Sequence, residues 1–225
     1  MTRTTNARIA GFTFLFYIAA GITSLVLFGR AAAGEGIATK LAGIAQHATD
    51  VRITVLLGLL QSFSAVVLGV TLYAITREQD RDLAMLGLVS RAAEGVIGAL
   101  GISSTLGLLW LATATGANLP DTAAAHALGS FLLRGNVALT ATFFAVGSAF
   151  FSYLLLRGRM IPIALAWLGV AASVLLVVGL PLQLAGFLRG PITSFMWLPM
   201  LVFEVPLALW LLIKGVATPE RVQSA

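Results

Sequence analysis

The sequence contains no cysteine, only two histidines and few charged residues. Without cysteine the chain cannot form disulfides, thiolate metal sites or a cysteine nucleophile. Charged residues make up 10% of the chain, whereas soluble domains contain about 25%. No stretch is both long and polar enough for a separate soluble domain, which needs about 50 residues or more. These absences exclude an ordinary soluble protein and indicate a chain surrounded by lipid.

Hydrophobic residues make up 59% of the chain, and the mean hydropathy is +0.97. A helix needs about 20 apolar residues to cross the ~30 Å hydrocarbon layer of a membrane. Six runs are long enough: residues 9–29, 51–76, 83–113, 128–156, 161–187 and 191–213. The sequence therefore predicts an all-α, polytopic membrane protein, a six-transmembrane-helix bundle in a single membrane domain over residues 1–225.

The first apolar run has two interpretations. Arg3 and Arg8 precede it, and residues 31–33 have the small side chains of a signal-peptide cleavage site. However, the run over residues 9–29 is longer than the ~7–15 residues of a signal-peptide core. We therefore predict an uncleaved transmembrane helix.

Basic residues are distributed unequally between the two ends of the predicted helices. Eight lie on the side of the termini, namely Arg3, Arg8, Arg77, Arg81, Arg157, Arg159, Lys214 and Arg221, against Arg30, Lys40, Arg52 and Arg189 on the other side. By the positive-inside rule, both termini are predicted to lie in the cytoplasm (N-in/C-in). The excess of Arg over Lys and the abundance of Ala favour a bacterial cytoplasmic membrane. On the opposite side, residues 37–47 are predicted to form a short helix at the membrane surface.

Four ionisable residues fall inside the predicted spans: Arg91, Glu94, Arg134 and Glu204. A charge at the centre of a bilayer costs at least ~2.5–3.5 kcal/mol on insertion scales, so such residues normally face the interior and find partners. Arg91 and Glu94 are three residues apart, which makes them neighbours on one helix surface and favours an ion pair. Glu94 and Glu204 are predicted to lie at a similar depth, near the middle of the membrane.

Small and polar residues line one face of three predicted helices, as expected where helices pack closely in a membrane. These stripes are Thr54, Gly58, Gln61, Ala65 and Gly69; Gly87, Arg91, Glu94, Gly95, Gly98, Gly101 and Thr105; and Arg134, Ala138, Ala141, Ala145, Ser148 and Ser152. Gln61 is therefore predicted to face the interior. The predicted polar centre consists of Arg91, Glu94, Glu204 and Gln61, with Arg134 and Gln183 as secondary members.

Three prolines lie in the last two predicted helices away from the first residues of each. Pro181 is close to Gln183, and Pro199 and Pro206 flank Glu204. A proline inside a helix lacks an N–H donor and leaves the carbonyl four residues earlier without its partner. Kinks are therefore predicted at all three positions. Neighbouring helices can also satisfy such groups, so a kink alone does not identify a binding site.

No motif for catalysis, for a cofactor or for nucleic acid occurs in the sequence. His47 and His126, with Asp50 and Asp121, offer a metal site only if the fold gathers them, because their spacing matches no zinc motif. Exposed histidines in connecting segments are the simpler interpretation. We predict no catalytic residue, cofactor, metal or nucleic-acid partner. The lipid bilayer is the expected surroundings, and the sequence predicts no oligomeric state.

Three stretches resemble a bacterial family of integral membrane proteins labelled domain of unknown function 4386. They are Ala7 to Gly11 with the apolar run that follows, Arg91 to Gly95 (Arg-Ala-Ala-Glu-Gly), and Phe203-Glu204 with Leu207 to Gly215. Val205-Pro206 departs from the pair expected in many relatives, so the kink there need not be general. The resemblance implies a compact multi-span membrane protein and draws attention to Arg91, Glu94 and Glu204. It implies no activity.

The polar centre permits several functions. The first is binding or transport of a small solute or a lipid-like molecule through a cavity lined by Gln61, Arg91, Glu94 and Glu204, including a proton-linked pathway. The second is a non-transporting membrane module that assembles with or regulates another membrane protein. The third is an intramembrane enzyme that uses Glu94 or Glu204 as a general acid or base. A buried ionic cluster that only fixes the packing of the helices is the structural alternative.

Overall fold

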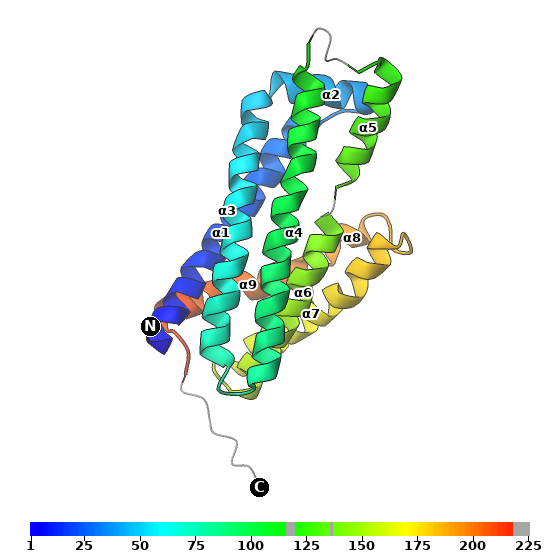
Figure 1. The fold of residues 1–225 in the computed structure, drawn as a ribbon. Helices are drawn as coiled ribbons and strands as arrows, with labels where there is room; N and C mark the ends of the chain where they lie inside the picture. The colour runs from blue at the N-terminus through cyan, green and yellow to red at the C-terminus, as the bar shows by residue number, and fades with distance from the viewer. Residues whose placement is uncertain (116–119, 136, 218–225) are drawn as a thin grey trace. The chain divides into compact units, whose positions relative to one another are not determined.

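The computed structural model describes residues 1–115, 120–135 and 137–217. All regular secondary structure in this part of the chain is α-helical (Figure 1). The helices are α1 (Arg3–Ala31), α2 (Ile37–Gln46), α3 (Ala48–Thr76), α4 (Arg81–Thr113), α5 (Thr122–Arg134), α6 (Val137–Arg157), α7 (Ile163–Leu184), α8 (Ile192–Phe195) and α9 (Leu198–Ile213).

Six helical stretches are long and apolar enough to cross a membrane, as predicted. They cover residues 3–31, 48–76, 81–113, 122–157, 163–184 and 192–213. Their ends extend beyond several of the predicted runs, because polar residues such as Arg3 and Asp50 continue a helix past its apolar part. The predicted short helix over residues 37–47 is confirmed as α2.

The fourth predicted helix, residues 128–156, is interrupted in the structure. Helix α5 ends at Arg134, Gly135 has a positive φ of 54°, and α6 begins at Val137. The Gly135 N–H donates to the carbonyl of Leu132 at 3.2 Å. Glycine reaches this left-handed conformation without a Cβ clash and is therefore the usual residue that ends a helix. The run is therefore divided into α5 and α6, which together make up one candidate span over residues 122–157.

The three prolines have different roles. Pro181 and Pro206 lie inside α7 and α9, as predicted. Pro199 instead occupies the second position of α9, after the short helix α8. The first turn of a helix has no intrahelical partner for its N–H groups, so a proline there disrupts no hydrogen bond. The predicted kink at Pro199 was wrong for this reason.

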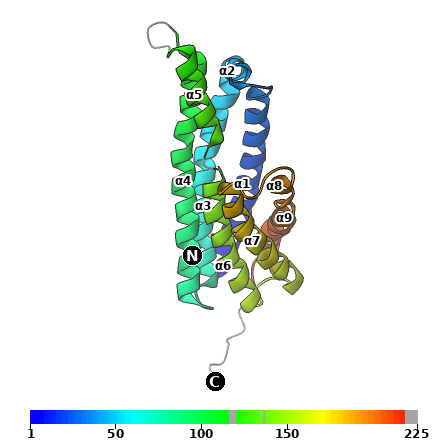
Figure 2. The ribbon, with the colours of Figure 1, turned by 90° about the vertical axis from the view of Figure 1, so that its right-hand side faces the viewer.

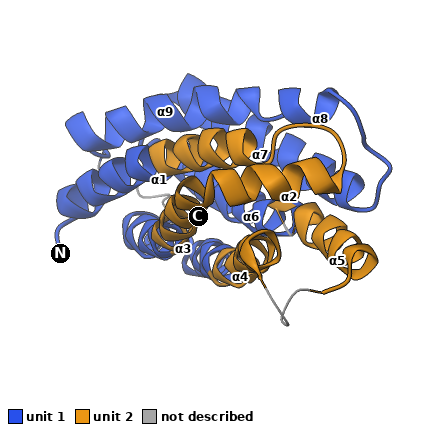
Figure 3. Cartoon of the chain, turned by 90° about the horizontal axis from the view of Figure 1, so that it is seen from above, with its two compact units in different colours: residues 1–17, 63–95, 138–225 blue, residues 18–62, 96–137 orange. Residues whose placement is uncertain are grey.

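The chain divides into two compact units, coloured in Figure 3. Unit 1 comprises residues 1–17, 63–95 and 138–225, and unit 2 comprises residues 18–62 and 96–137. Helices α1, α3 and α4 therefore contribute residues to both units. Each unit has a hydrophobic core of its own, centred in unit 1 on α7 and α9 and in unit 2 on α2 and its neighbours.

In unit 1, helix α7 packs against α9 (Figure 2). The contact is close because Gly169 of α7 faces the ring of Phe203 on α9 with no room for a side chain. Helix α1 approaches α9 in the same way at Gly11. A Cβ atom on Gly11 would lie 2.6 Å from both the Ala208 carbonyl oxygen and the Leu212 nitrogen. Small residues thus let the backbone of one helix in unit 1 contact a side chain or the backbone of its neighbour.

One end of unit 1 gathers the start of α1, the α3–α4 turn, the α6–α7 turn and residue 217. The Arg3 guanidinium donates a hydrogen bond to the Ile75 carbonyl at 2.5 Å. Three further contacts join the segments: Arg3 Nη1 lies 3.3 Å from Glu78 Oε2, Arg157 Nη1 lies 3.3 Å from Asp80 Oδ2, and the Ala217 N–H donates to the Met160 carbonyl at 3.0 Å. These segments carry most of the basic residues that the sequence places on the side of the termini. Arg221, assigned to the same side, lies outside the described residues.

In unit 2, helix α2 packs against α5. Ile37 of α2 closes on Gly129 of α5, and Ile44 is fully buried with Val51 and Leu108. Helix α2 is amphipathic in sequence and has one apolar face against this core. Unit 2 therefore has a small core around α2.

We expect Gly11→Ala to lower the thermal stability of the protein in detergent. The added methyl group would overlap the backbone of α9, and overpacking of this kind costs about 1–3 kcal/mol. Gly29→Ala is the matched control on the same helix, because a Cβ atom there meets no atom within 4 Å. A melting temperature unchanged by Gly11→Ala, or lowered equally by Gly29→Ala, would contradict the close approach of α1 and α9.

Candidate functional site

Arg91 occupies the centre of the site. It lies on α4 with 1% of its surface exposed. Glycines on two neighbouring helices make room for its aliphatic stem: a Cβ atom on Gly69 of α3 would lie 3.0 Å from the Arg91 Cβ, and one on Gly147 of α6 would lie 3.0 Å from its Cγ and Cδ. Gly69 belongs to a predicted stripe, whereas Gly147 does not; both glycines give the Arg91 side chain room between the helices.

Glu94 provides the negative charge beside Arg91. Its side chain is 2% exposed, and its Oε2 atom lies 2.9 Å from Arg91 Nη1. The predicted ion pair between positions three apart is therefore present. The N–H bonds of Arg91 are not aligned with this oxygen, so none of the guanidinium nitrogens has a hydrogen-bond partner among the described residues. The pair is held by charge, without the bidentate hydrogen bonds that strengthen many arginine–carboxylate contacts.

Two aromatic side chains complete the surroundings of the ion pair. Tyr17 of α1 donates a hydrogen bond from its hydroxyl to Glu94 Oε1 at 2.7 Å. The guanidinium carbon of Arg91 lies 5.4 Å from the centroid of the Tyr17 ring and 5.0 Å from that of Phe144 on α6. A cation over an aromatic face is attracted by the electron density of the ring, and more strongly where water is absent. The rings thus replace part of the hydration that Arg91 loses.

Glu204 adds a second carboxylate to the same region. It lies on α9 with 6% of its surface exposed and interacts electrostatically with Arg91 and Glu94. Among the described residues it has no hydrogen bond and no ion pair within 4.0 Å. Arg91, Glu94 and Glu204 are also the only buried charged side chains in the described part of the chain. We call Tyr17, Arg91, Glu94 and Glu204 the polar centre.

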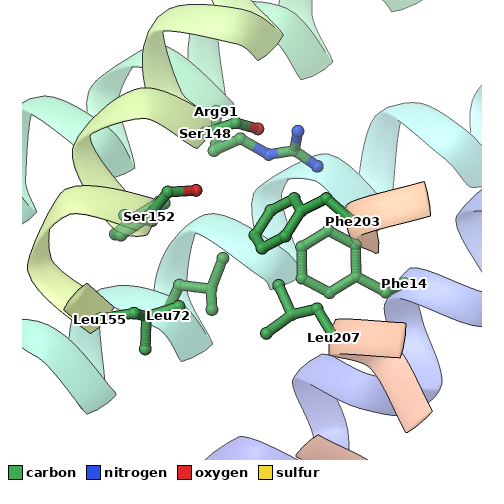
Figure 4. Close-up of a pocket in the computed structure, with 9 residues that line it drawn as sticks. Phe14, Leu72, Arg91, Ser148, Ser152, Leu155, Phe203 and Leu207 are labelled. Carbon is green, nitrogen blue, oxygen red and sulfur yellow. The ribbon is translucent and has the colours of Figure 1, made fainter. Parts of the chain in front are cut away.

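A small cavity adjoins the Arg91 side chain (Figure 4). Its volume is about 10 Å³. Ser148 and Ser152 lie on one side of it and Phe14, Phe203 and Leu207 on the other, with the Arg91 guanidinium at one end. A cavity of this size holds about one water molecule, provided that polar groups surround it. The arginine N–H groups and the serine hydroxyls meet that condition.

The other predicted members of the centre are Gln61, Arg134 and Gln183. Gln61 belongs to unit 2, where its Nε2 atom occupies the space in front of Gly21. Arg134 is exposed in the last turn of α5. Gln183 is half-buried near the end of α7, and its Oε1 atom has no hydrogen-bond partner among the described residues. The structure therefore brings Arg91, Glu94 and Glu204 together in unit 1, and Arg91 alone of the predicted residues lines the cavity.

Tyr17 is a member of the polar centre that the sequence analysis did not identify. It lies inside the apolar run over residues 9–29, away from both ends, whereas Tyr73 and Tyr153 lie near the ends of their helices. A buried phenol requires a hydrogen-bond partner. This position was therefore a signal for a polar contact at depth, although it did not reveal the partner.

The histidines form no metal site in the described part of the chain. His47 Nδ1 lies 3.5 Å from Asp50 Oδ2, and Arg30 approaches the same carboxylate at 3.9 Å. No group of three or more His, Asp or Glu side chains that could hold a metal ion occurs among the residues described. Asp121 has a structural role, because its carboxylate accepts a hydrogen bond from the Ala124 N–H and caps α5.

A family model described as "Domain of unknown function (DUF4386)" matches residues 9–215. The chain belongs to this family. The match includes every residue of the polar centre and all six candidate spans at least in part. No curated protein and no solved structure matches the chain. Membership of the DUF4386 family thus agrees with a multi-span membrane protein and assigns no reaction or ligand to the polar centre.

We expect Glu94→Gln to destabilise the protein by about 3–5 kcal/mol, because it leaves the buried Arg91 charge without an ion-pair partner within 4.0 Å among the described residues. The double variant Arg91→Met/Glu94→Leu should regain most of this loss, since hydrophobic replacement of a buried ion pair is often neutral or stabilising. Thermal unfolding of the purified protein in detergent measures both effects. Equal stability of the single and double variants would mean that the charge pair does not determine the folding of unit 1.

Proposed function

We propose that this protein is a multi-pass protein of the bacterial cytoplasmic membrane whose polar centre binds and releases one proton. Proton binding at membrane depth is the step on which proton-linked transport depends. The observation that carries the proposal is the presence, among the described residues of unit 1, of two buried carboxylates and one buried cation. With every group ionised, Arg91 contributes +1 and the two glutamates contribute −2, which leaves a charge of −1.

An unbalanced charge is unfavourable in a medium of low dielectric constant, and it is removed most simply by neutralisation. Glu94 already has two partners, the Arg91 guanidinium and the Tyr17 hydroxyl. Glu204 has neither a hydrogen bond nor an ion pair among the described residues. Of the two carboxylates, Glu204 is therefore the group that gains most from accepting a proton.

The size of the cavity favours a proton over the larger ligands considered from the sequence. A volume of about 10 Å³ accommodates one water molecule and no solute of several heavy atoms. The cavity at the polar centre is therefore too small for a lipid-like molecule. A proton needs no cavity, and a water molecule bound beside Arg91 would provide a polar contact that rearranges when the charge of the centre changes.

The proposed orientation has both termini in the cytoplasm. It follows from the excess of basic residues at the end of unit 1 that gathers the start of α1, the α3–α4 turn and the α6–α7 turn. Lys214 and Arg159 belong to the same end. Loops rich in Lys and Arg remain on the cytoplasmic side during membrane insertion.

Infrared difference spectroscopy of the reconstituted protein tests the proposal. On a change from acidic to alkaline pH, we expect the wild-type protein to lose a C=O stretching band of a protonated carboxylic acid. Glu204→Gln should abolish this change, and it should leave the melting temperature close to that of the wild type, because glutamine has the shape and neutrality of a protonated glutamate.

The matched control is Glu78→Gln, which removes a carboxylate that is 65% exposed at the end of unit 1. It should leave the buried band intact. A spectrum of the wild type without a protonated carboxyl band, or a band that persists in Glu204→Gln, would refute proton binding at Glu204. The polar centre would then be a buried ionic cluster that only fixes the packing of the helices.

A further inference from the structure

A second site lies at the end of unit 1 where α6 turns into α7 and α9 ends. A pocket of about 440 Å³ is formed there by residues 159–162, Trp210 and residues 214–217. Among the described residues, its walls include two cations, Arg159 and Lys214, and no acidic side chain. It contains none of the residues of the polar centre. The pocket is therefore independent of the proposed proton site.

Backbone contacts bring the two cationic residues to the same pocket. Arg159 has a φ of 47°, and it is the only non-glycine residue with a positive φ in the described part of the chain. Its N–H donates to the Leu156 carbonyl at 3.0 Å, which closes the turn after α6. Across the pocket, the Ala217 N–H donates to the Met160 carbonyl at 3.0 Å. This hydrogen bond joins the segment after α9 to the turn between α6 and α7, so that Lys214 and Arg159 line the same pocket.

The remaining walls are apolar and lie at the ends of candidate spans. Met160, Ile161 and Val216 line the pocket together with Trp210, which is 36% exposed. Tryptophan is enriched at the level of lipid headgroups, where one part of its ring is in an apolar medium and the other is near water. Next to the pocket, Ile213 presents an exposed apolar surface on α9. An anion with an attached hydrocarbon chain fits these surroundings better than a free anion.

We propose that this pocket binds the phosphate headgroup of an anionic phospholipid from the leaflet at this end of unit 1. Arg159 and Lys214 contact the phosphate, and Trp210 and Ile213 contact the glycerol and the first part of an acyl chain. Arginine and lysine are the side chains that bind phosphate oxygens, by a planar set of donors and by a point charge respectively. Basic residues near a membrane surface attract anionic lipids, and each contributes to affinity.

Lipid binding to the full-length protein in detergent tests the proposal. Native mass spectrometry would measure the binding of three probes: dioctanoyl phosphatidylglycerol, dioctanoyl phosphatidylcholine and inorganic phosphate. We expect one phosphatidylglycerol molecule to bind more tightly than phosphatidylcholine, and we expect no binding of inorganic phosphate at the same concentration. The variant Arg159→Gln/Lys214→Gln should weaken phosphatidylglycerol binding by about tenfold or more.

The control variant Arg77→Gln/Arg81→Gln removes the same charge from exposed positions in the α3–α4 turn, outside the pocket. It should change the affinity less than twofold. An equal loss in both double variants would show attraction to net charge alone and would overturn the site. Binding of inorganic phosphate as tight as that of phosphatidylglycerol would overturn the assignment to a lipid. Should the first double variant fail to fold, Lys214→Gln alone, on an exposed residue, must still weaken binding or the proposal fails.

Discussion

The arrangement of unit 1 depends on a guanidinium group buried in an apolar protein. A charge placed at the centre of a bilayer costs at least ~2.5–3.5 kcal/mol, so each neighbour of Arg91 reduces this cost. Glu94 supplies the opposite charge from the next turn of α4, and two aromatic rings cover the faces of the cation. Gly69 and Gly147 admit the stem of the side chain between three helices. Arg91 therefore links α1, α3, α4 and α6 through a single group.

Glu204 is the residue on which the proposed proton binding depends, because a centre that only fixed helix packing would need a single carboxylate. One carboxylate is sufficient to neutralise Arg91, and Glu94 occupies that place with a hydrogen bond from Tyr17. Glu204 brings a further charge into the same region without a direct partner among the described residues. Such a group lowers stability whenever it is ionised, because its desolvation is not offset. The proposed role in proton binding gives a reason for its presence that helix packing alone does not give.

The sequence predicts the parts of this structure that depend on local patterns. Run length gives the candidate spans, and the spacing of Arg91 and Glu94 gives their ion pair. The break at Gly135 and the role of Pro199 were missed because hydrophobicity was weighed above the chemistry of helix ends. The contact of Tyr17 with Glu94 joins positions 77 residues apart. No local pattern encodes a contact of that range without knowledge of which helices are neighbours.

Helix α9 carries parts of both proposed sites, Glu204 at the polar centre and Trp210 with Lys214 at the pocket. Ten residues separate Glu204 from Lys214, which corresponds to about 15 Å along a helix. Pro206 lies between them and cannot donate the hydrogen bond that Val202 would otherwise accept. Helix α9 therefore lacks one backbone hydrogen bond that a regular helix would have at this place. A bound anionic lipid can therefore influence the protonation of Glu204 in two ways, by the repulsion between its phosphate and the carboxylate over this distance and by a change in the bend of α9.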